Sequence, residues 1–468
     1  MPRFYSFPQE IQQMILGFVA ESPNTSKYAC VNKDWQYFFE KKNFKSLTLK
    51  QGDIDDFSQV VTVERQHLVK HVWLRVELPE YSTNQYKEEE DPKALWEADS
   101  IFTKSIFSMW DVLSQWNQER QDGITFELSA HSRSDWAAYL KDHNTVEEDE
   151  KEYRRYLTSN SKEPYNPPSP HLPYVKLHEA LGTPTCSITS SQRDAYWYST
   201  VNNLLGWKPL EFIPTQTSEN TTKIVEDDNP QLPEVPVISK FLIRRHQFRE
   251  IYPTALGMMT NSLSNVEDVH IERWRCAESR DEKSWCHEAH ITFGMDLPLS
   301  VKSLALSGET NDIFHMWDAK DIKAMSLAKS LRRYSRHLEH LSVSNLIDAK
   351  DFFDPFKRPG SEKSTASIPN WENLETLRLT SDLFEKGSEK SVESLLSAAA
   401  RAARKMPRLR SLELWSDHEK VFSYSIMDTV ADIRWPRSRL NTLSTQAVNE
   451  WERTAAFHGR EDFRITIS

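Results

Sequence analysis

Two cysteines and two histidines of this chain lie close together and are of the types that bind zinc: Cys276, Cys286, His287 and His290. Structural zinc sites usually pair their ligands at short, regular spacings, and this spacing matches no familiar finger. The Glu-Ser-Arg-Asp-Glu-Lys stretch between the cysteines is typical of an exposed loop. The His-Glu-Ala-His segment is one residue short of the His-Glu-x-x-His pattern that brings two ligands to one helix face. The sequence therefore predicts no metal site and no metalloprotease.

Phosphate and acyl-transfer chemistry also lack their usual patterns. The chain has 11 glycines and contains neither Gly-x-Gly-x-x-Gly nor Gly-x-x-x-x-Gly-Lys, which bring the backbone close to phosphates. It contains no Gly-x-Ser-x-Gly nucleophile elbow. We therefore expect a protein without a catalytic site or a cofactor.

A cluster suited to binding is Arg273-Trp274-Arg275, which follows a predicted strand ending at Ile271. The carboxyl ends of parallel strands commonly carry ligands, and Trp and Arg are enriched at binding hot spots. We predict that these three residues contact a protein. In the alternative, Trp274 packs beneath the next repeat and the arginines pair with Glu272 or Glu278. Burial decides between the two.

The elements that would position this cluster repeat along the chain. Three apolar residues recur at offsets of 0, 3 and 5, as in the Leu-x-x-Leu-x-Leu core of leucine-rich repeats. The repeats begin at Phe44, Val69, Ile238, Val266, Val301, Leu338, Leu374 and Leu409. From Val266 onward successive starts differ by 35, 37, 36 and 35 residues, which leaves room for a strand and a full helix in each unit.

The segments between the triplets have helical periodicity. One apolar face precedes Pro407 and comprises Val392, Leu395, Leu396, Ala399, Ala402, Ala403 and Met406. A second precedes residue 338 and comprises Ala324, Leu327, Ala328, Leu331 and Tyr334, and Pro253 begins a third helix. Right-handed crossovers then predict a curved α/β solenoid with parallel strands inside and helices outside. The alternating Phe463, Ile465 and Ile467 predict a closing edge strand.

One region interrupts this repetition. Residues from about 141 to 236 hold an acidic run at 147–150 and eleven of the 23 prolines. This composition opposes regular structure and predicts a long, partly irregular insertion.

The first residues predict a helical unit. Ser6 and Gln9 indicate a helix start, with Pro8 in the first turn. Apolar residues then follow in a stripe, namely Ile11, Met14, Ile15, Phe18 and Val19, while Leu16 lies off that stripe. About forty residues bury too little surface to be stable alone, so an apolar flank should remain for a partner.

These residues resemble an F-box. The family pattern of Leu-Pro-x-Glu-Ile, Ile-Leu, a small-residue and Val segment and Lys-x-Trp corresponds to Phe7-Pro8-Gln9-Glu10-Ile11, Ile15-Leu16, Ala29-Cys30-Val31 and Lys33-Asp34-Trp35. The one departure, Phe7 for Leu, keeps an apolar anchor. Further on, the blocks 243–275 and 368–415 resemble fungal F-box proteins with leucine-rich-repeat-like C-terminal domains.

The resemblance implies a three-helix F-box at residues 1–45 and a leucine-rich-repeat-like solenoid at residues 46–468. It implies binding to the Skp adaptor through Phe7, Pro8, Ile11, Ile15 and Leu16, and through Skp to a cullin. The protein would be the substrate-recognition subunit of an SCF-type ubiquitin ligase, and Arg273, Trp274 and Arg275 would contact its unknown protein substrate. The alternative is a Skp-binding structural or regulatory module outside a ligase. Ubiquitin chemistry would be performed by partners.

Composition agrees with an intracellular scaffold. Four cysteines in 468 residues show no disulfide-like spacing, so we expect a reducing compartment, the cytoplasm or the nucleus. The apolar run from Met14 to Ala20 is too short to span a bilayer, and no membrane partner is expected. A net charge of −11 opposes a nucleic acid as the main partner.

Overall fold

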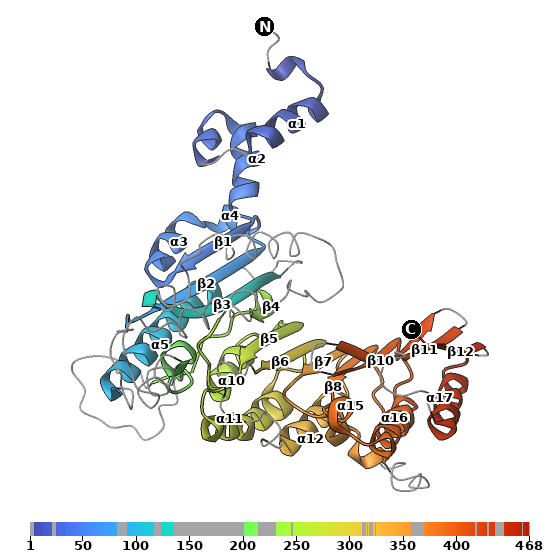
Figure 1. The fold of residues 1–468 in the computed structure, drawn as a ribbon. Helices are drawn as coiled ribbons and strands as arrows, with labels where there is room; N and C mark the ends of the chain where they lie inside the picture. The colour runs from blue at the N-terminus through green and yellow to red at the C-terminus, as the bar shows by residue number, and fades with distance from the viewer. Residues whose placement is uncertain are drawn as a thin grey trace, which may run out of the picture.

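The fold is mixed α/β, with one open sheet of 12 strands in the order β1 to β12 (Figure 1). The computed structural model describes residues 4–20, 25–81, 91–116, 123–134, 201–213, 231–244, 247–310, 315, 317, 322, 324–357, 369–416, 419–427, 430–435, 444–460 and 462–467. The strands are β1 Ser46–Lys50, β2 His71–Leu78, β3 Ile124–Ser132, β4 Ile238–Ile243, β5 Asp268–Trp274, β6 Ser303–Glu309, β7 His340–Ser344, β8 Thr376–Thr380, β9 Ser411–Ser416, β10 Glu419–Met427, β11 Val430–Trp435 and β12 Asp462–Ile467.

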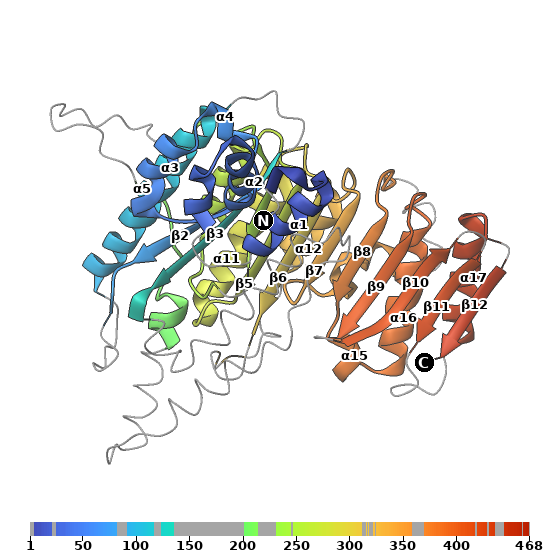
Figure 2. The ribbon, with the colours of Figure 1, turned by 90° about the horizontal axis from the view of Figure 1, so that it is seen from above.

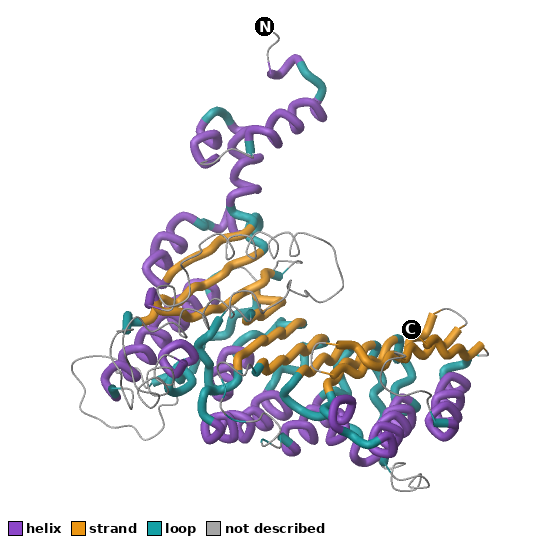
Figure 3. The backbone as a smooth tube through the Cα atoms, viewed as in Figure 1, coloured by secondary structure: helices purple, strands orange, loops and turns teal. Residues whose placement is uncertain are grey.

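Helices gather along one side of the strand layer (Figure 3). The helices of the described residues include α1 Gln9–Val19, η2 Thr25–Cys30, α2 Lys33–Asn43, α3 Ile54–Val60, α4 Val63–Gln66, α5 Pro92–Ser114, α10 Pro253–Asn261, α11 Ser279–Ile291, α12 Met325–Tyr334, α13 Ala349–Phe352, α15 Leu383–Lys386, α16 Glu389–Ala403 and α17 Thr445–Phe457. The predicted apolar faces of α12 and α16 are buried, and Pro253 begins α10 as predicted.

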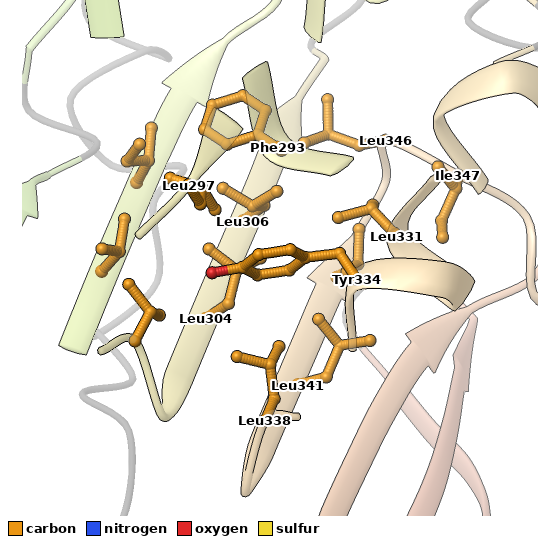
Figure 4. Packing of buried hydrophobic residues seen from close by; sticks show 14 of the residues in the cluster. Phe293, Leu297, Leu304, Leu306, Leu331, Tyr334, Leu338, Leu341, Leu346 and Ile347 are labelled. Atoms are coloured by element: carbon orange, nitrogen blue, oxygen red, sulfur yellow. The ribbon is translucent and has the colours of Figure 1, made fainter. Parts of the chain in front are cut away.

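A row of apolar residues crosses the whole sheet in register on the helix-covered side. It runs through Leu47, Val72, Phe126, Phe241, Val269, Leu304, Leu341, Leu377, Leu412, Tyr424, Ile433 and Ile465. Because side chains alternate between the two faces of a strand, this row and its neighbours form a continuous core with the helices. Figure 4 shows the core between β6, β7 and α12, where Leu304 and Leu341 pack with Leu331 and Tyr334.

The predicted repetition is confirmed for β5 to β9. These strands begin at Asp268, Ser303, His340, Thr376 and Ser411, each two residues after the predicted start of its repeat. All four neighbouring pairs are parallel, and Leu377 of β8 lies opposite Leu412 of β9.

Three strands were not predicted. β3 lies between β2 and β4, and β10 and β11 form an antiparallel hairpin that follows β9. The prediction of a purely parallel sheet is therefore wrong at its C-terminal end. A tight hairpin needs no crossover helix, so β10 follows β9 directly and runs back along it. β12 pairs in parallel with β11 and closes the sheet as an edge strand, as predicted (Figure 2).

The N-terminal helical unit, comprising α1, η2 and α2, stands beyond β1 and apart from the sheet (Figure 1). The predicted boundary between residues 45 and 46 falls where β1 begins, although the division into an F-box and a solenoid stays a prediction. Most of the predicted insertion at 141–236 lies outside the described residues. Its described parts include the buried Val201, Leu204 and Leu205. Among the described residues no helix is long and apolar enough to cross a membrane.

Candidate functional site

Helix α1 begins two residues later than the sequence predicts. Phe4–Ser6 form a 3-10 turn, and Pro8 takes the N-cap position with extended backbone, so the helix starts at Gln9. The Gln12 side-chain amide donates to the Phe7 carbonyl at 2.8 Å, which holds the incoming chain against the first turn. The prediction that Ser6 caps this helix is therefore wrong.

One side of α1 forms the core of the helical unit. Leu16 and Ala20 are buried against Phe39 of α2, and half-buried aromatic rings enclose them. The Asn32 side chain caps α2 by accepting from the backbone N–H groups of Asp34 and Trp35 at 2.9 and 3.0 Å. This core is small. One side-chain cap and a few buried rings stabilise a short helix pair only weakly.

The other side of α1 presents apolar residues to solvent. Met14 is 57% exposed and Phe18 67% exposed, and Ile11 lies on the same side. We call Ile11, Met14 and Phe18 the α1 apolar face, because positions i, i+3 and i+7 share one side of a helix. The only charged residue of α1 is Glu10. An uncharged apolar surface of this kind is typical of the centre of a protein interface.

The five residues predicted to bind Skp differ in how exposed they are. Ile11 and Pro8 are exposed, and Phe7 and Ile15 are half-buried. Leu16 is 6% exposed and packs inside the unit, so it cannot serve as a surface anchor. The prediction is corrected here: Leu16 lies off the stripe because it belongs to the small core, not because it remains for a partner.

Other exposed apolar residues of the unit were not predicted as site residues. Met14 and Phe18 were assigned only to a helical stripe, and Val31 and Tyr37 are exposed as well. The spacing of Leu16 and Ala20 by four residues could have indicated a second, inward side of α1. The Ile11, Met14 and Phe18 set would then have been assigned to the outward side.

A polar contact joins the helical unit to the sheet. Arg65 of α4 donates to the Glu40 carboxylate of α2 at 2.8 Å, and its guanidinium lies 5.3 Å from the centre of the Phe44 ring. Phe44 directly follows α2, two residues before β1. Arg65 therefore contacts both α2 and the residue that follows it, next to the start of β1.

The predicted protein-binding cluster at the end of β5 lies inside the fold. Trp274 is 3% exposed and stacks on Phe248, while the side chains of Arg273 and Arg275 are buried and ion-paired. An enclosed indole between paired arginines fits the packing alternative. We therefore remove Arg273, Trp274 and Arg275 from the candidate surface. Their partners include Glu250 and Glu282, which the sequence did not predict.

Glu250, Arg273, Arg275 and Glu282 form a buried ionic cluster between β5 and α11. Arg273 donates to Glu250 at 2.6 Å and makes a two-point contact with Glu282 at 3.0 and 2.7 Å. Arg275 Nε lies 3.4 Å from the Glu282 carboxylate, which also accepts from the backbone N–H of Cys276 at 3.0 Å. Arg273 and Arg275 thus face Glu250 and Glu282 in a site that is almost completely buried.

The two glutamates of this cluster have opposite pKa shifts. Burial raises the pKa of Glu250 to about 8, against the attraction of Arg273. Burial would also raise the pKa of Glu282, but Arg273 and Arg275 outweigh it and lower the pKa to about 2. Glu282 is the carboxylate that balances the arginines, because it receives most of their hydrogen bonds.

The residues considered for zinc do not form a ligand set. Cys276 and Cys286 are buried beside Glu282 and Arg273, and burial raises the pKa of the Cys286 thiol to about 12. His287 and His290 lie on the less buried side of α11. Within the described ranges no group of three or more His, Cys, Asp or Glu side chains could hold a metal ion.

A half-buried Trp and Arg pair lies on the face of the sheet that carries no described helix over β7 to β9. The Arg378 guanidinium stacks 4.8 Å from the ring centre of Trp415 and donates to Glu413 at 2.9 Å. Trp415 Nε1 also donates to Glu413 at 3.1 Å. We call these three residues the β8–β9 polar cluster. Its Trp and Arg are accessible, in contrast to those at residues 273–275.

A comparison with protein families finds one match. The model of a family of unknown function, DUF6546, matches residues 296–468, which contain β6 to β12. No curated protein matches the chain. The match covers the C-terminal part of the sheet and leaves the N-terminal helical unit outside it.

Proposed function

We propose that this protein is the substrate-recognition subunit of an SCF-type ubiquitin ligase and binds a Skp adaptor through its N-terminal helical unit. The observation that carries the proposal is the α1 apolar face, which exposes Ile11, Met14 and Phe18 on a unit with a core of its own. Burying such a surface against a partner would yield about 25 cal/mol per Å² of apolar area. The F-box-like sequence of residues 7–35 identifies the kind of partner.

The proposal interprets the helical unit as an F-box and the sheet as a leucine-rich-repeat-like solenoid. Support comes from α1, η2 and α2, which precede β1, and from the parallel strand and helix units that repeat from β5 to β9. The β10–β11 hairpin departs from a simple solenoid and would act as a terminal addition to the repeats.

We propose that the substrate binds the face that carries the β8–β9 polar cluster. Arg378 and Trp415 are residue types enriched at hot spots, and both are half-buried. The Glu413 carboxylate accepts hydrogen bonds from the Arg378 guanidinium and from the Trp415 indole and so holds both groups in place. Such a preordered pair loses little conformational freedom on binding. This cluster takes the place that the sequence assigned to residues 273–275.

In this function the protein needs no catalytic group. Binding of Skp and substrate to one chain would raise the effective concentration of the substrate near a ubiquitin-charged enzyme recruited by the cullin. The Arg65 and Glu40 contact joins the helical unit to α4 and would help to orient the two partners.

Co-purification tests the proposal. The full chain is mixed with purified Skp, cullin and the RING subunit and passed over a sizing column. The proposal expects a single complex that contains all four proteins. Retention of Skp without cullin would favour a role outside a ligase, and failure to retain Skp would overturn the proposal.

A further inference from the structure

The apolar row that crosses the sheet ends uncovered at β12. Eleven strands precede β12 in the row, and most members of the row are fully buried because they have neighbours on both sides. Ile465, the last member, is 39% exposed. Among large apolar residues of the described strands, only Met427 at the end of β10 is comparably exposed.

The two edges of the sheet differ. At the first edge, helix α3 follows β1 and buries Ile54 and Phe57 in the same core that Leu47 and Leu49 contact. At the other edge, α17 precedes β12 and packs with Trp451 against β10. β12 is the last strand in the sheet order, so its outer edge pairs with no strand of the described residues (Figure 2).

Among the antiparallel registers that keep the apolar residues of β12 opposite one another without opposing like charges, one pairs most of the strand with itself. If Ile465 lies opposite Ile465 of a second copy, Phe463 falls opposite Ile467 and Arg464 opposite Thr466. Phe463 and Ile465 of both copies then share the helix-covered side, and no two like charges face each other directly. Shifting the pairing by one residue would place Arg464 opposite Ile465 or Ile467, which mixes the two faces, and moving the axis to Arg464 would oppose two arginines.

We propose that β12 is a self-association surface, at which two copies of this chain join their sheets edge to edge about a two-fold axis at Ile465. A two-fold contact uses the same strand on both copies, and the new strand pair continues the apolar row across the axis. Since β1 and β12 are opposite edges, the two N-terminal helical units would lie at the far ends of the joined sheet. This inference does not depend on the proposed function.

A single pair of six-residue strands is expected to bury less than the roughly 1,200–2,000 Å² of a standard interface. The dimer should therefore be weak and reversible, with a Kd on the order of 100 µM. Sedimentation velocity of the full chain over a concentration series should show the weight-average mass rising toward twice that of the chain. A monomer at every concentration would overturn the proposal.

Charge variants test the register. Ile465→Lys and Ile465→Glu each place like charges at the axis, so each variant alone should remain monomeric, whereas an equimolar mixture should dimerise. Ile291→Lys is the matched control, because Ile291 of α11 is similarly exposed at 37% and far from β12 in sequence. A dimer that persists in the Ile465→Lys variant, or a mixture that stays monomeric, would contradict the register.

Cross-linking provides a second test if a charge variant fails to fold. In a Cys30→Ser background, which removes an exposed thiol, Ile465→Cys should form a disulfide-linked dimer when oxidised glutathione is added. The Arg464→Cys variant should cross-link at least tenfold more slowly, because position 464 faces position 466 of the other copy. Equal cross-linking at both positions, or none at position 465, would overturn the proposal.

Discussion

At the scale of single residues, the most tightly constrained charges are those of the buried ionic cluster. Arg273 and Arg275 resemble surface binding residues by type and position, yet each is enclosed and paired. A sequence gives the residue types but not the carboxylates that a fold brings beside them. Glu250 and Glu282 come from the segment before α10 and from α11, so their approach depends on helix packing.

Removing the charge of Glu282 should cost far more than removing that of Glu250. Glu282→Gln leaves two buried guanidinium groups short of a counter-charge, which typically costs about 3–5 kcal/mol. Glu250→Gln imitates the protonated acid that its raised pKa favours near neutral pH and should cost clearly less. Chemical denaturation of both variants at pH 7 measures the difference. Equal losses would contradict this division of roles.

The same shifts predict how stability depends on pH. The pKa of Glu282 is lower when folded than its ordinary value of 4.5, so its contribution is full above pH 4.5 and is lost as pH falls toward 2. The pKa of Glu250 is raised, so its contribution falls as pH rises from 4.5 toward 8. In thermal melts, Glu250→Gln should flatten the decline between pH 5 and 8. If the loss of stability between pH 5 and 8 is unchanged in this variant, groups other than Glu250 cause it.

At the scale of elements, the sequence predicted the strands and helices whose apolar residues recur at regular spacing. The repeat spacing placed β5 to β9 correctly, and the apolar faces of α12 and α16 are buried as expected. β10 and β11 carry the same 0, 3 and 5 spacing, at Val421, Tyr424 and Ile426 and at Val430, Ile433 and Trp435. They were missed because these triplets follow one another within a few residues, which leaves no room for the helix of the predicted repeat unit. For α1, the period alone could not decide which of two apolar sides faces the small core.

The aligned leucines of β8 and β9 should be intolerant of charge. Leu377 and Leu412 lie opposite each other and are buried, so Leu377→Asp or Leu412→Asp would place an unpaired carboxylate in the core and cost several kcal/mol. Ser342→Asp is the control, since Ser342 is half-buried on the other face and lies opposite Arg378. Melting temperatures of the three variants test this. A Leu377→Asp variant that melts like the wild type would contradict the packing.

At the scale of the whole molecule, the chain separates its two proposed binding functions. The α1 apolar face lies beyond the β1 edge, while the β8–β9 polar cluster lies toward the other end of the sheet. F-box-like residues led to the prediction of the first partner, whereas the residues predicted to contact a substrate, 273–275, are buried. It could not distinguish a buried Trp from an accessible one, because both follow the same strand pattern.

Substrate capture should depend on Trp415 and not on Trp274. In cells that express the tagged full chain, proximity labelling with and without proteasome inhibition identifies candidate substrates. Trp415→Ala should reduce capture by roughly tenfold or more, as is typical of an interface hot spot, while leaving Skp binding unchanged. Arg408→Ala, which alters an exposed residue before β9, is the control. Unchanged capture would remove the β8–β9 polar cluster from the proposed function.

The affinity of the full chain for purified Skp tests the central claim most directly. If the α1 apolar face is the contact, truncating Met14 and Phe18 to Ala should each cost about 2 kcal/mol, and together they should weaken binding roughly 10³-fold. The Trp96→Ala control removes an equally exposed ring from α5, at 61% exposure, and should bind as the wild type does. Circular dichroism should show all variants folded. Undiminished binding by the double variant, measured by calorimetry, would contradict the account.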